Sequence, residues 1–564
     1  MIQLRPTSRN LLLLLLILYI PFLGMTLFNT KGEPREAVVA VSMIQQHDWI
    51  LPVSNGVDIP YKPPMLAWCI AIISELSGGE VTEYTSRLPS ALAMIIMTMG
   101  VFCTIRRRIN APVAFTTALI MMTSFELQRA ATSCRVDMLN TMFIVMAMLV
   151  FFRTFNSPRK RIISIGFILM MSGATLTKGP VGIILPCAVA WIYMLISGEH
   201  WWRATWQTSL CAILALILPA LWYYAAWQRG GDEFYRLMME ENFGRMTGTM
   251  SYGSHENPWY YNIITIIAGM LPFTLLPLMS LPFLRIHDLR NAPRRWWSAL
   301  RGANPWNRYA IVIFAVVFIF YCIPASKRSV YLLPLYPALA YAVALLAQWL
   351  TVRSPRVLRI FAVIIALIPV IALIAFQVIR SAHPQVRSIS AQQIIDGIIG
   401  QPVDMLSFVL LMVMVIMAVL TLRGLRRTSP QNLFQFTLLT LFTIFLSFEA
   451  FFQPAVLNGK SDKIIAQQLY SQGFGEERQL HGWVNDSLLR FYTVNFYLGN
   501  SVTNCEKTAE QLPREFLVGE KDYQEHCLPK YGHKYQMRIL QRFNHRSCDL
   551  KQPVLLIEAV EIEQ

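Results

Sequence analysis

The sequence predicts a polytopic α-helical membrane protein of about thirteen transmembrane helices, followed by a small C-terminal soluble α/β domain. Its 564 residues are 55% hydrophobic and only 15% charged, whereas soluble proteins have about 25% charged residues. Apolar runs of about 20 residues recur as far as residue 451. After Pro454, polar residues and turn formers replace these runs. A water-soluble globular protein is therefore excluded.

Each predicted transmembrane helix is an apolar run, because about 20 such residues are needed to cross the hydrocarbon core of a bilayer. The first run follows Arg5 and Arg9 and has no small-residue cleavage site, so we expect a retained anchor and not a signal peptide. The predicted helices lie at about 10–29, 86–105, 110–127, 137–153, 161–177, 180–197, 205–227, 259–284, 308–324, 330–350, 357–379, 403–423 and 432–451.

The net charge is +16, from 49 Lys and Arg against 33 Asp and Glu. Most of this surplus lies in short connections, and loops rich in Lys and Arg typically face the cytoplasm. Their alternation predicts that the N-terminus is cytoplasmic and the C-terminal domain lies outside. Membrane lipids, and not nucleic acid, are the expected partners of these charges. The basic connections are 106–108, 159–161, 285–308, 353–359 and 423–427.

The residue pattern divides the chain into two parts. Residues 1–451 form the transmembrane part, with outer loops at 30–85 and 228–258. Residues 452–564 contain the short amphipathic stretches LLRFYTVNFYLG and PVLLIEAVEI, which predict the soluble α/β domain. On an oxidising side of the membrane, one pair of its cysteines could form a disulfide and leave one free thiol. These cysteines are Cys505, Cys527 and Cys548.

Several clusters of charged residues lie in the outer loops, against the orientation preference of Lys and Arg. Charged residues at membrane depth are costly and often mark a functional site. The clusters lie at 31–36 with 61–64, at 129–137, at 177–180 and at 324–331, and the loop 228–258 adds further charges. The candidate site residues are Glu33, Arg35, Lys62, Asp137, Lys178, Glu241, Arg245, Lys327, Arg328 and Tyr331.

Each of these clusters also has a simpler explanation. Glu33, Glu36 and Asp137 could be carboxylates that interact with free N–H groups at a helix N-terminus. Lys178 could extend from a helix end to the membrane interface. Lys327 and Arg328 contradict the orientation preference most directly. Together, the cations can bind a lipid phosphate while a carboxylate activates or orients an attacking hydroxyl. Because these cations can balance the charge of a lipid phosphate, no cofactor is predicted and no divalent metal is required.

These stretches resemble the bacterial GT-C glycosyltransferases, which include the lipid A aminoarabinose transferase and the protein O-mannosyltransferase-like enzymes. The matching segments follow one another over about the first 350 residues. They are GEPREAVVAVSMIQQHDWILP, YKPPMLAW, SRLPSALA, SCRVDMLN, LTKGPVGIILP, MEENFGRM with HENPWYY, and SKRSVYLLPLYPALA. The resemblance implies a GT-C type fold for the transmembrane part.

The resemblance also implies roles for single residues. Glu33 matches an acidic active-site position of the first loop, and Asp137 matches a second acidic position. Lys62 matches a lysine near the carrier phosphate, and Arg245 and Lys327 match basic positions of later loops. Many relatives read Asp-Glu where this chain has Gly32-Glu33, so Glu33 and Asp137 could share the catalytic role.

The implied function is transfer of a sugar from a polyprenyl-phosphate donor to a lipid (lipid A-like), glycan or protein acceptor. The resemblance implies that this transfer takes place at the outer, periplasmic face of a bacterial inner membrane. It also implies that the transfer inverts the anomeric carbon. A hydroxyl acceptor needs a general base, whereas a lipid A phosphate is already anionic and needs none. The alternative is a transporter or flippase of lipid-linked sugars, for which polar residues at mid-membrane depth are typical.

Overall fold

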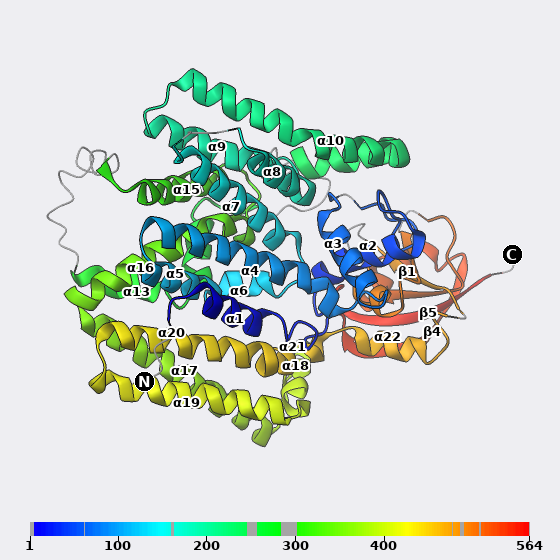
Figure 1. Cartoon of the computed structure of the whole chain (residues 1–564). Helices are drawn as coiled ribbons and strands as arrows, with labels where there is room; N and C mark the ends of the chain where they lie inside the picture. The colour runs from blue at the N-terminus through cyan, green and yellow to red at the C-terminus, as the bar shows by residue number, and fades with distance from the viewer. Residues whose placement is uncertain are drawn as a thin grey trace.

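Helices make up the described chain as far as Lys460, and every described strand follows that residue. The computed structural model describes residues 5–60, 62–158, 163–244, 256–283, 302–476, 478–485, 490–506 and 509–562. The helices pack into a bundle, and a five-stranded sheet with short helices lies at one end of it (Figure 1). The predicted fold class, a large helical part followed by a small α/β domain, is confirmed.

The first half of the bundle alternates long helices with short ones. The longest, α10, contains a break at Gly231, which adopts a left-handed backbone (φ 55°). The helices are α1 (Ser8–Tyr19), α2 (Gly32–Gln46), α3 (Met65–Leu76), α4 (Glu83–Arg108), α5 (Ala111–Met122), α6 (Phe125–Ala131), α7 (Val136–Phe155), α8 (Ile165–Lys178), α9 (Val181–Ile196), α10 (Trp201–Met239) and the π-helical turn η1 (Glu240–Gly244).

The second half runs from Tyr261 to Lys460 and leads into the C-terminal domain. It comprises α12 (Tyr261–Gly269), α13 (Leu275–Ser280), η2 (Leu281–Phe283), α15 (Pro305–Cys322), η4 (Ser329–Leu335), α16 (Tyr336–Arg353), α17 (Pro355–Ala382), α18 (Ile389–Gly400), α19 (Met405–Arg427), α20 (Pro430–Ser447), η5 (Phe448–Phe452), α21 (Gln453–Leu457) and η6 (Asn458–Lys460).

Among the described residues, 8 helical stretches are long and apolar enough to cross a membrane. They contain α4, α7, α10, α15, α16, α17, α19 and α20, and each coincides with a predicted transmembrane run. Helices α1, α5, α8 and α9 also coincide with predicted runs but are shorter, between 12 and 16 residues. The apolar runs therefore located these helices correctly and overestimated the length of the short ones.

The run predicted at 259–284 is wrong as a single helix. Helices α12 and α13 are separated at 270–274, where Pro272 lacks the N–H that a continuous helix requires. The predicted outer loop 30–85 contains two helices, α2 and α3. The apolar helix α3 has 12 residues. A transmembrane helix needs about 20 apolar residues, so α3 was not among the predicted transmembrane runs.

The two ends of the bundle differ in chemistry. At one end, Arg106 donates to Ser8 (3.2 Å), and Asn304 donates to the carbonyl of Arg108 (3.5 Å). This end therefore gathers predicted inner connections that are distant in sequence. The opposite end carries the predicted outer loops and the C-terminal domain (Figure 1). The alternation inferred from the basic loops is thus consistent with the packing of the helices.

The C-terminal domain contains one mixed sheet with strand order β2-β1-β3-β5-β4. Strand β1 runs parallel to β2 and β3, whereas β5 is antiparallel to β3 and β4. Two apolar clusters pack within the domain, one around Leu517 and Val554 and the other around Phe516 and Ile557. Its elements are α22 (Lys463–Tyr470), β1 (Leu480–Val484), α23 (Tyr492–Tyr497), β2 (Val502–Glu506), β3 (Glu515–Gly519), α24 (Glu520–Asp522), η7 (Tyr523–Cys527), α25 (Leu528–Tyr531), β4 (Tyr535–Arg546) and β5 (Pro553–Glu561).

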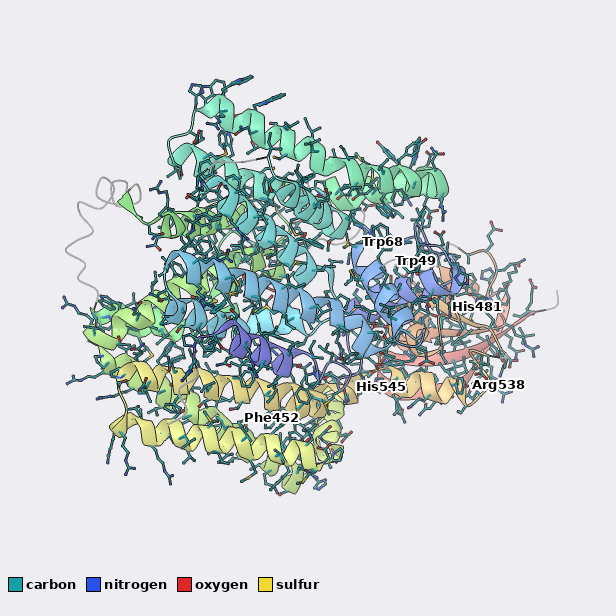
Figure 2. The ribbon with its side chains drawn as sticks, in the orientation of Figure 1. Trp49, Trp68, Phe452, His481, Arg538 and His545 are labelled. Atoms are coloured by element: carbon teal, nitrogen blue, oxygen red, sulfur yellow. The ribbon has the colours of Figure 1, made fainter. Side chains whose placement is uncertain are left out.

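The C-terminal domain contacts the bundle through helix α18 and through the loop at 50–60. Gln393 of α18 hydrogen-bonds to the ring of His545 in β4 (2.7 Å), and Figure 2 shows His545 at this junction. In the loop, the Asn55 carbonyl accepts the N–H of Asn504 in β2 (3.1 Å). All nine cysteines of the chain are free thiols, so no pair in this domain forms the disulfide considered from the sequence.

Candidate active site

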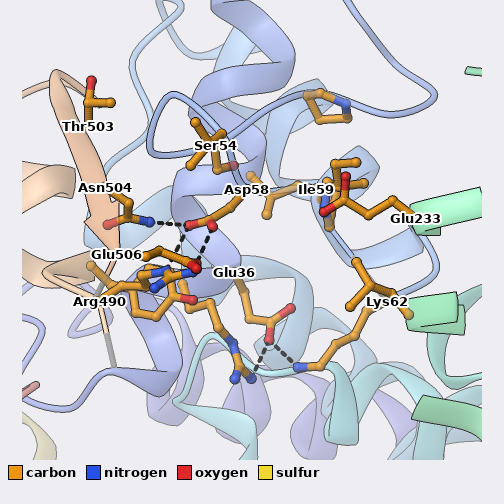
Figure 3. Close-up of a pocket in the computed structure, with 18 of the residues that line it drawn as sticks. Glu36, Ser54, Asp58, Ile59, Lys62, Glu233, Arg490, Thr503, Asn504 and Glu506 are labelled. Carbon is orange, nitrogen blue, oxygen red and sulfur yellow. Dashed lines mark hydrogen bonds and ion pairs between the residues drawn. The ribbon is translucent and has the colours of Figure 1, made fainter. Parts of the chain in front are cut away.

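A cavity of about 1020 Å³ lies between the first outer loop, the end of α10 and the C-terminal domain. This volume is at the upper end of the range for ligand pockets. The bundle contributes Glu36 and Lys62 to the lining, and the C-terminal domain contributes Arg490 and Asn504. Figure 3 shows these side chains around the cavity, together with Glu233 of α10, which also lines it. The cavity is therefore shared by segments that lie far apart in the sequence.

On the bundle side, Glu36 holds two cations. Its Oε1 atom accepts from Arg35 (3.0 Å) and forms an ion pair with Lys62 (Figure 3). Burial raises the pKa of Glu36, but Lys62 and Arg35 together lower it below its ordinary value. Burial and the neighbouring Arg35 lower the pKa of Lys62 to about 8, although Glu36 and Glu241 oppose this shift. Arg35, Glu36 and Glu241 thus all act electrostatically on Lys62.

Glu33 lies deeper, in the first turn of α2. Both of its oxygens pair with Arg87 (2.8 and 3.1 Å), and Oε1 also accepts the N–H of Cys134 (2.9 Å). Arg87 is only 3% exposed. Burial raises the pKa of Glu33, but Arg87, the Cys134 N–H and Arg135 bring it below its ordinary value. Glu33 therefore neutralises a buried arginine and connects α2 to α4 and to the segment before α7.

The surroundings of Gly32 explain why a glycine fits at this position. A Cβ atom at this position would collide with the guanidinium of Arg135. The cation of Arg135 thus occupies the space that a side chain at position 32 would fill.

A second group of predicted residues meets at the start of α7. Asp137 forms an ion pair with Lys178 at the end of α8, and the Lys178 ammonium lies 4.2 Å from the centre of the Tyr331 ring. The turn after Lys178 contacts η1 closely, because a Cβ atom on Gly179 would collide with Asn242. Asp137, Lys178 and Tyr331 are therefore brought together from α7, α8 and η4, next to the segment that contains Glu241.

The remaining predicted cations occupy different positions. Lys327 is buried, and its ammonium donates to the Pro324 carbonyl (2.6 Å). Arg328 precedes η4, the helix that carries Tyr331. Arg245 lies outside the described residues. Lys327 thus supports the local loop, and its predicted contact with a phosphate stays a prediction.

The sequence did not point to the cavity residues that link the first loop to the C-terminal domain. Asp58 pairs with Arg490 through both oxygens (3.1 and 3.2 Å) and accepts from Asn504 (2.6 Å). Arg490 also donates to Glu506 (2.7 Å). Asp58 and Arg490 are 432 residues apart, so no local pattern could connect them. Glu36 was recognised only as a carboxylate near a helix start.

One buried cluster in the described C-terminal domain has atoms spaced as metal ligands would be. The ligand atoms of Asp462, Cys548 and Asp549 lie within 4.8 Å of one another. Asp462 already accepts from Ser547 (2.7 Å), and Asp549 accepts from Thr493 (2.7 and 2.9 Å). Burial and the charge of Asp462 raise the pKa of Asp549 well above the usual carboxyl range. These hydrogen bonds account for the carboxylates without a metal ion.

Comparisons with known proteins match this architecture. A family model described as dolichyl-phosphate-mannose-protein mannosyltransferase matches residues 61–224. The crystal structure of ArnT from Cupriavidus metallidurans bound to undecaprenyl phosphate superimposes with a TM-score of 0.69 at 19% sequence identity, over 97% of both chains. The chain has the GT-C fold. The resemblance that the sequence predicted is confirmed for the fold, which is that of a multi-pass membrane protein.

Two curated relatives illustrate the similarity in sequence. An undecaprenyl phosphate-alpha-4-amino-4-deoxy-L-arabinose arabinosyl transferase of Shewanella sediminis is 26% identical over 345 residues, 59% of this chain and 58% of that protein. An uncharacterised protein of Aquifex aeolicus is 25% identical over 334 residues, 58% of this chain and 61% of that protein. The matched regions thus span about three fifths of these relatives. Within the GT-C fold, the cavity described above is the candidate active site.

Proposed function

We propose that this chain is an integral membrane glycosyltransferase that moves a sugar from a polyprenyl-phosphate donor to a lipid, glycan or protein acceptor. The observation that carries the proposal is the cavity, at which Lys62, Arg35 and Glu36 meet at the predicted outer end of a GT-C fold. The name of the Shewanella relative and the undecaprenyl phosphate in the Cupriavidus ArnT structure support a polyprenyl-phosphate donor. The donor phosphate would bind at this cluster of cations.

The proposed roles of the cations are those that the departure of a phosphate requires when a sugar is transferred. Charge develops on the phosphate oxygens as the bond to the anomeric carbon breaks, and cations fixed in a poorly hydrated site stabilise that charge. Lys62 and Arg35 line the cavity and are placed to contact the leaving phosphate. Lys178, Arg245, Lys327, Arg328 and Tyr331 are proposed to complete the donor site. Attack from the opposite face inverts the anomeric carbon.

A carboxylate is needed if the acceptor is a hydroxyl. Glu33 and Asp137 stay predicted catalytic residues, and we add Glu36 as a third candidate. Unlike the first two, Glu36 lines the cavity in the described part of the chain. Its Oε1 atom holds Arg35 and Lys62, so the carboxylate has a fixed orientation beside the donor cations. Glu36 is therefore the candidate base that an acceptor in the cavity reaches directly.

The proposed setting is a bacterial inner membrane, with the N-terminus in the cytoplasm and the C-terminal domain in the periplasm. The basic connections support this orientation. The chain would divide at about residue 451 into a transmembrane part and a periplasmic domain. The transporter alternative is less favoured, because the ion pairs of Glu33, Glu36 and Asp137 lie at helix starts and not at the middle of the bundle.

The test is a transfer reaction with the purified full-length protein in lipid vesicles. Radiolabelled polyprenyl-phosphate sugars are supplied with acceptors extracted from bacterial envelopes. We expect the label to move to an acceptor as polyprenyl phosphate is released, and Lys62→Ala to raise the KM for the donor about 10- to 100-fold. Intact donor after incubation with each sugar and acceptor would refute the proposal.

A further inference from the structure

The C-terminal domain supplies one wall of the cavity, and this wall includes Arg490. Arg490 is only 5% exposed. Its guanidinium pairs with both oxygens of Asp58 in the first outer loop, and also with Glu506 of β2 (Figure 3). Asn504 of the same strand donates to Asp58 as well (2.6 Å). Hydrogen bonds to charged groups are stronger than neutral ones, so Asp58 fixes the first outer loop to the C-terminal domain.

The turn that carries Asp58 has the shape that this contact requires. Ser54 and Asp58 exchange backbone hydrogen bonds (2.7 and 2.9 Å) and close the turn. Asn55 and Gly56 between them have left-handed backbones (φ 49° and 75°). A Cβ atom on Gly56 would collide with the side chain of Thr503 in β2, so a glycine lets the turn lie this close to the strand. The contact with the C-terminal domain is therefore part of the fold of the loop.

The chain that follows Asp58 leads directly to Lys62, four residues later. Three of the five residues at 60–64 are prolines: Pro60, Pro63 and Pro64. A proline has a fixed φ and no N–H, and the residue before a proline, such as Lys62, is also restricted. This short segment can neither bend freely nor form many backbone hydrogen bonds of its own. A displacement of Asp58 is therefore expected to displace Lys62.

The surroundings of Lys62 show why its backbone has to be held. The ammonium is buried beside Arg35, and both effects lower the pKa of Lys62 to about 8. The ion pair with Glu36 and the charge of Glu241 offset only part of this shift. A lowered pKa means that the ammonium is less stable here than in water. Because a lysine side chain is flexible and strongly hydrated, Lys62 would turn toward the solvent if its backbone were free.

One further contact of the segment is apolar. Ile59 packs against the cluster that contains Trp222 and Phe234 of α10. Apolar contacts are non-directional, so this packing retains the segment without setting its orientation. The hydrogen bonds of Asp58 are directional and lie one residue before Ile59. They are therefore the contacts that orient the segment toward Glu36 and Arg35.

We propose that the C-terminal domain positions Lys62: Arg490 and Asn504 hold Asp58, and the proline-rich segment keeps the ammonium in the cavity. Asp58 and Arg490 are thus positioning residues that act through Lys62. The use of Lys62 to bind the donor phosphate rests on the proposed function, whereas its placement does not. The domain that follows the bundle thereby contributes to the donor side of the cavity as well as to the opposite wall.

The experiment measures the Lys62 amine in the full-length protein in lipid vesicles. An amine-reactive reagent modifies only the neutral amine, so the pH dependence of labelling at Lys62, followed by mass spectrometry, gives its pKa. In the wild type we expect a midpoint near pH 8. In Asp58→Asn and Arg490→Gln the released side chain becomes hydrated, and the midpoint should rise by about one pH unit or more toward the ordinary value of about 10.4.

The two variants remove charges of opposite sign. Direct electrostatic effects on Lys62 would shift its midpoint down in Asp58→Asn and up in Arg490→Gln, whereas release of Lys62 shifts both upward. Asn504→Ala removes no charge and should shift the midpoint upward by less, which keeps the test available if a charge variant does not fold. Gln393→Ala is the matched control, because it removes a contact between α18 and the same domain; its midpoint should equal that of the wild type.

Transfer of sugar is the second measurement. Asp58→Asn should raise the KM for the donor about tenfold. The same substitution in a Lys62→Ala background should raise it no further, because both residues act through one ammonium. A further rise in that background would overturn the inference, since Asp58 would then act independently of Lys62.

The labelling result separates this inference from the proposed function. A wild-type midpoint near the ordinary value, an unchanged midpoint in the variants that fold, or opposite shifts in the two charge variants would overturn the positioning of Lys62. Upward shifts in a protein that transfers no sugar would confirm the positioning and refute the proposed function instead.

Discussion

Glu33 and Glu36 lie close together in α2, but their oxygens contact different partners and so have different physical roles. Glu33 and Glu36 are separated by less than one helical turn of α2. Both oxygens of Glu33 face Arg87, whereas Glu36 points to the cavity and holds Arg35 and Lys62. A carboxylate that neutralises a buried arginine contributes to folding, and one that lines a cavity can meet a substrate. The two residues are therefore expected to respond differently to the same substitution.

We predict that Glu36→Gln lowers the turnover number about 10²- to 10⁴-fold, as expected when a general base is removed, with little change in thermal stability. Glu33→Gln should instead destabilise the protein, because it leaves the buried Arg87 without its partner, at a cost of about 3–5 kcal/mol. The measurements are the transfer rate and the melting temperature of each purified variant. A stable Glu33→Gln without turnover, beside a fully active Glu36→Gln, would assign the role to Glu33.

The lowered pKa of Lys62 predicts that binding of the donor depends on pH. Its pKa is lowered to about 8, and only the protonated ammonium attracts the donor phosphate. The charged form dominates below pH 8 and is lost as the pH rises through that value. The KM for the donor should therefore rise above pH 8, by about tenfold per pH unit at most. The measurement is a donor titration between pH 6 and 10.

The control for this prediction is Lys62→Arg. A guanidinium stays protonated across this range, so the rise in KM above pH 8 should disappear even if the variant binds the donor less tightly at all pH values. A rise of the same size in Lys62→Arg would show that another group causes it.

At the scale of elements, the turn between α8 and α9 positions several candidate residues at once. Lys178 ends α8, and Gly179 follows with φ +80°. A Cβ atom at Gly179 would collide with the side-chain oxygen of Asn242 in η1, so the turn places the ion pair of Asp137 and Lys178 next to the segment that carries Glu241. A side chain at position 179 would therefore have to displace the side chain of Asn242.

We predict that Gly179→Ala reduces transfer strongly, because the added methyl group strains the left-handed backbone and also displaces Asn242. Gly198→Ala is the matched control: Gly198 has φ +88°, but a Cβ there meets open space. Gly198→Ala should cost about 1 kcal/mol of stability from backbone strain and keep near wild-type transfer. Equal loss of transfer in both variants would attribute the effect to strain alone and not to the contact with Asn242.

The sequence could predict those features that show as a pattern within one short segment, such as an apolar run or a charge cluster. The apolar runs located α4, α7 and the other long helices, and the charge clusters identified Asp137, Lys178 and Tyr331, which meet in the structure. It could not predict the break at Pro272 or the wall around Arg490. The partner of Arg490, Asp58, comes from a loop 432 residues earlier, and only the folded arrangement of the two domains brings them together.

At the scale of the whole molecule, two distant parts of the chain line the cavity. The first outer loop supplies the proposed donor cations, and the C-terminal domain supplies the opposite wall. The loop at 50–60 contacts both, through Asn55 and Asp58. The cavity is therefore complete only when the C-terminal domain lies on the same side of the membrane as the first loop, so the proposed reaction requires this topology.

The orientation can be tested with alkaline phosphatase, which is active only when exported. Figure 1 shows the connection between α19 and α20 at the end of the bundle away from the sheet. We predict that a fusion after Arg427 is inactive and that a fusion to the end of the full chain is active, because α20 crosses the membrane between these points. The same activity in both would exclude that crossing. The reverse pattern would place the cavity in the cytoplasm and overturn the proposed periplasmic reaction.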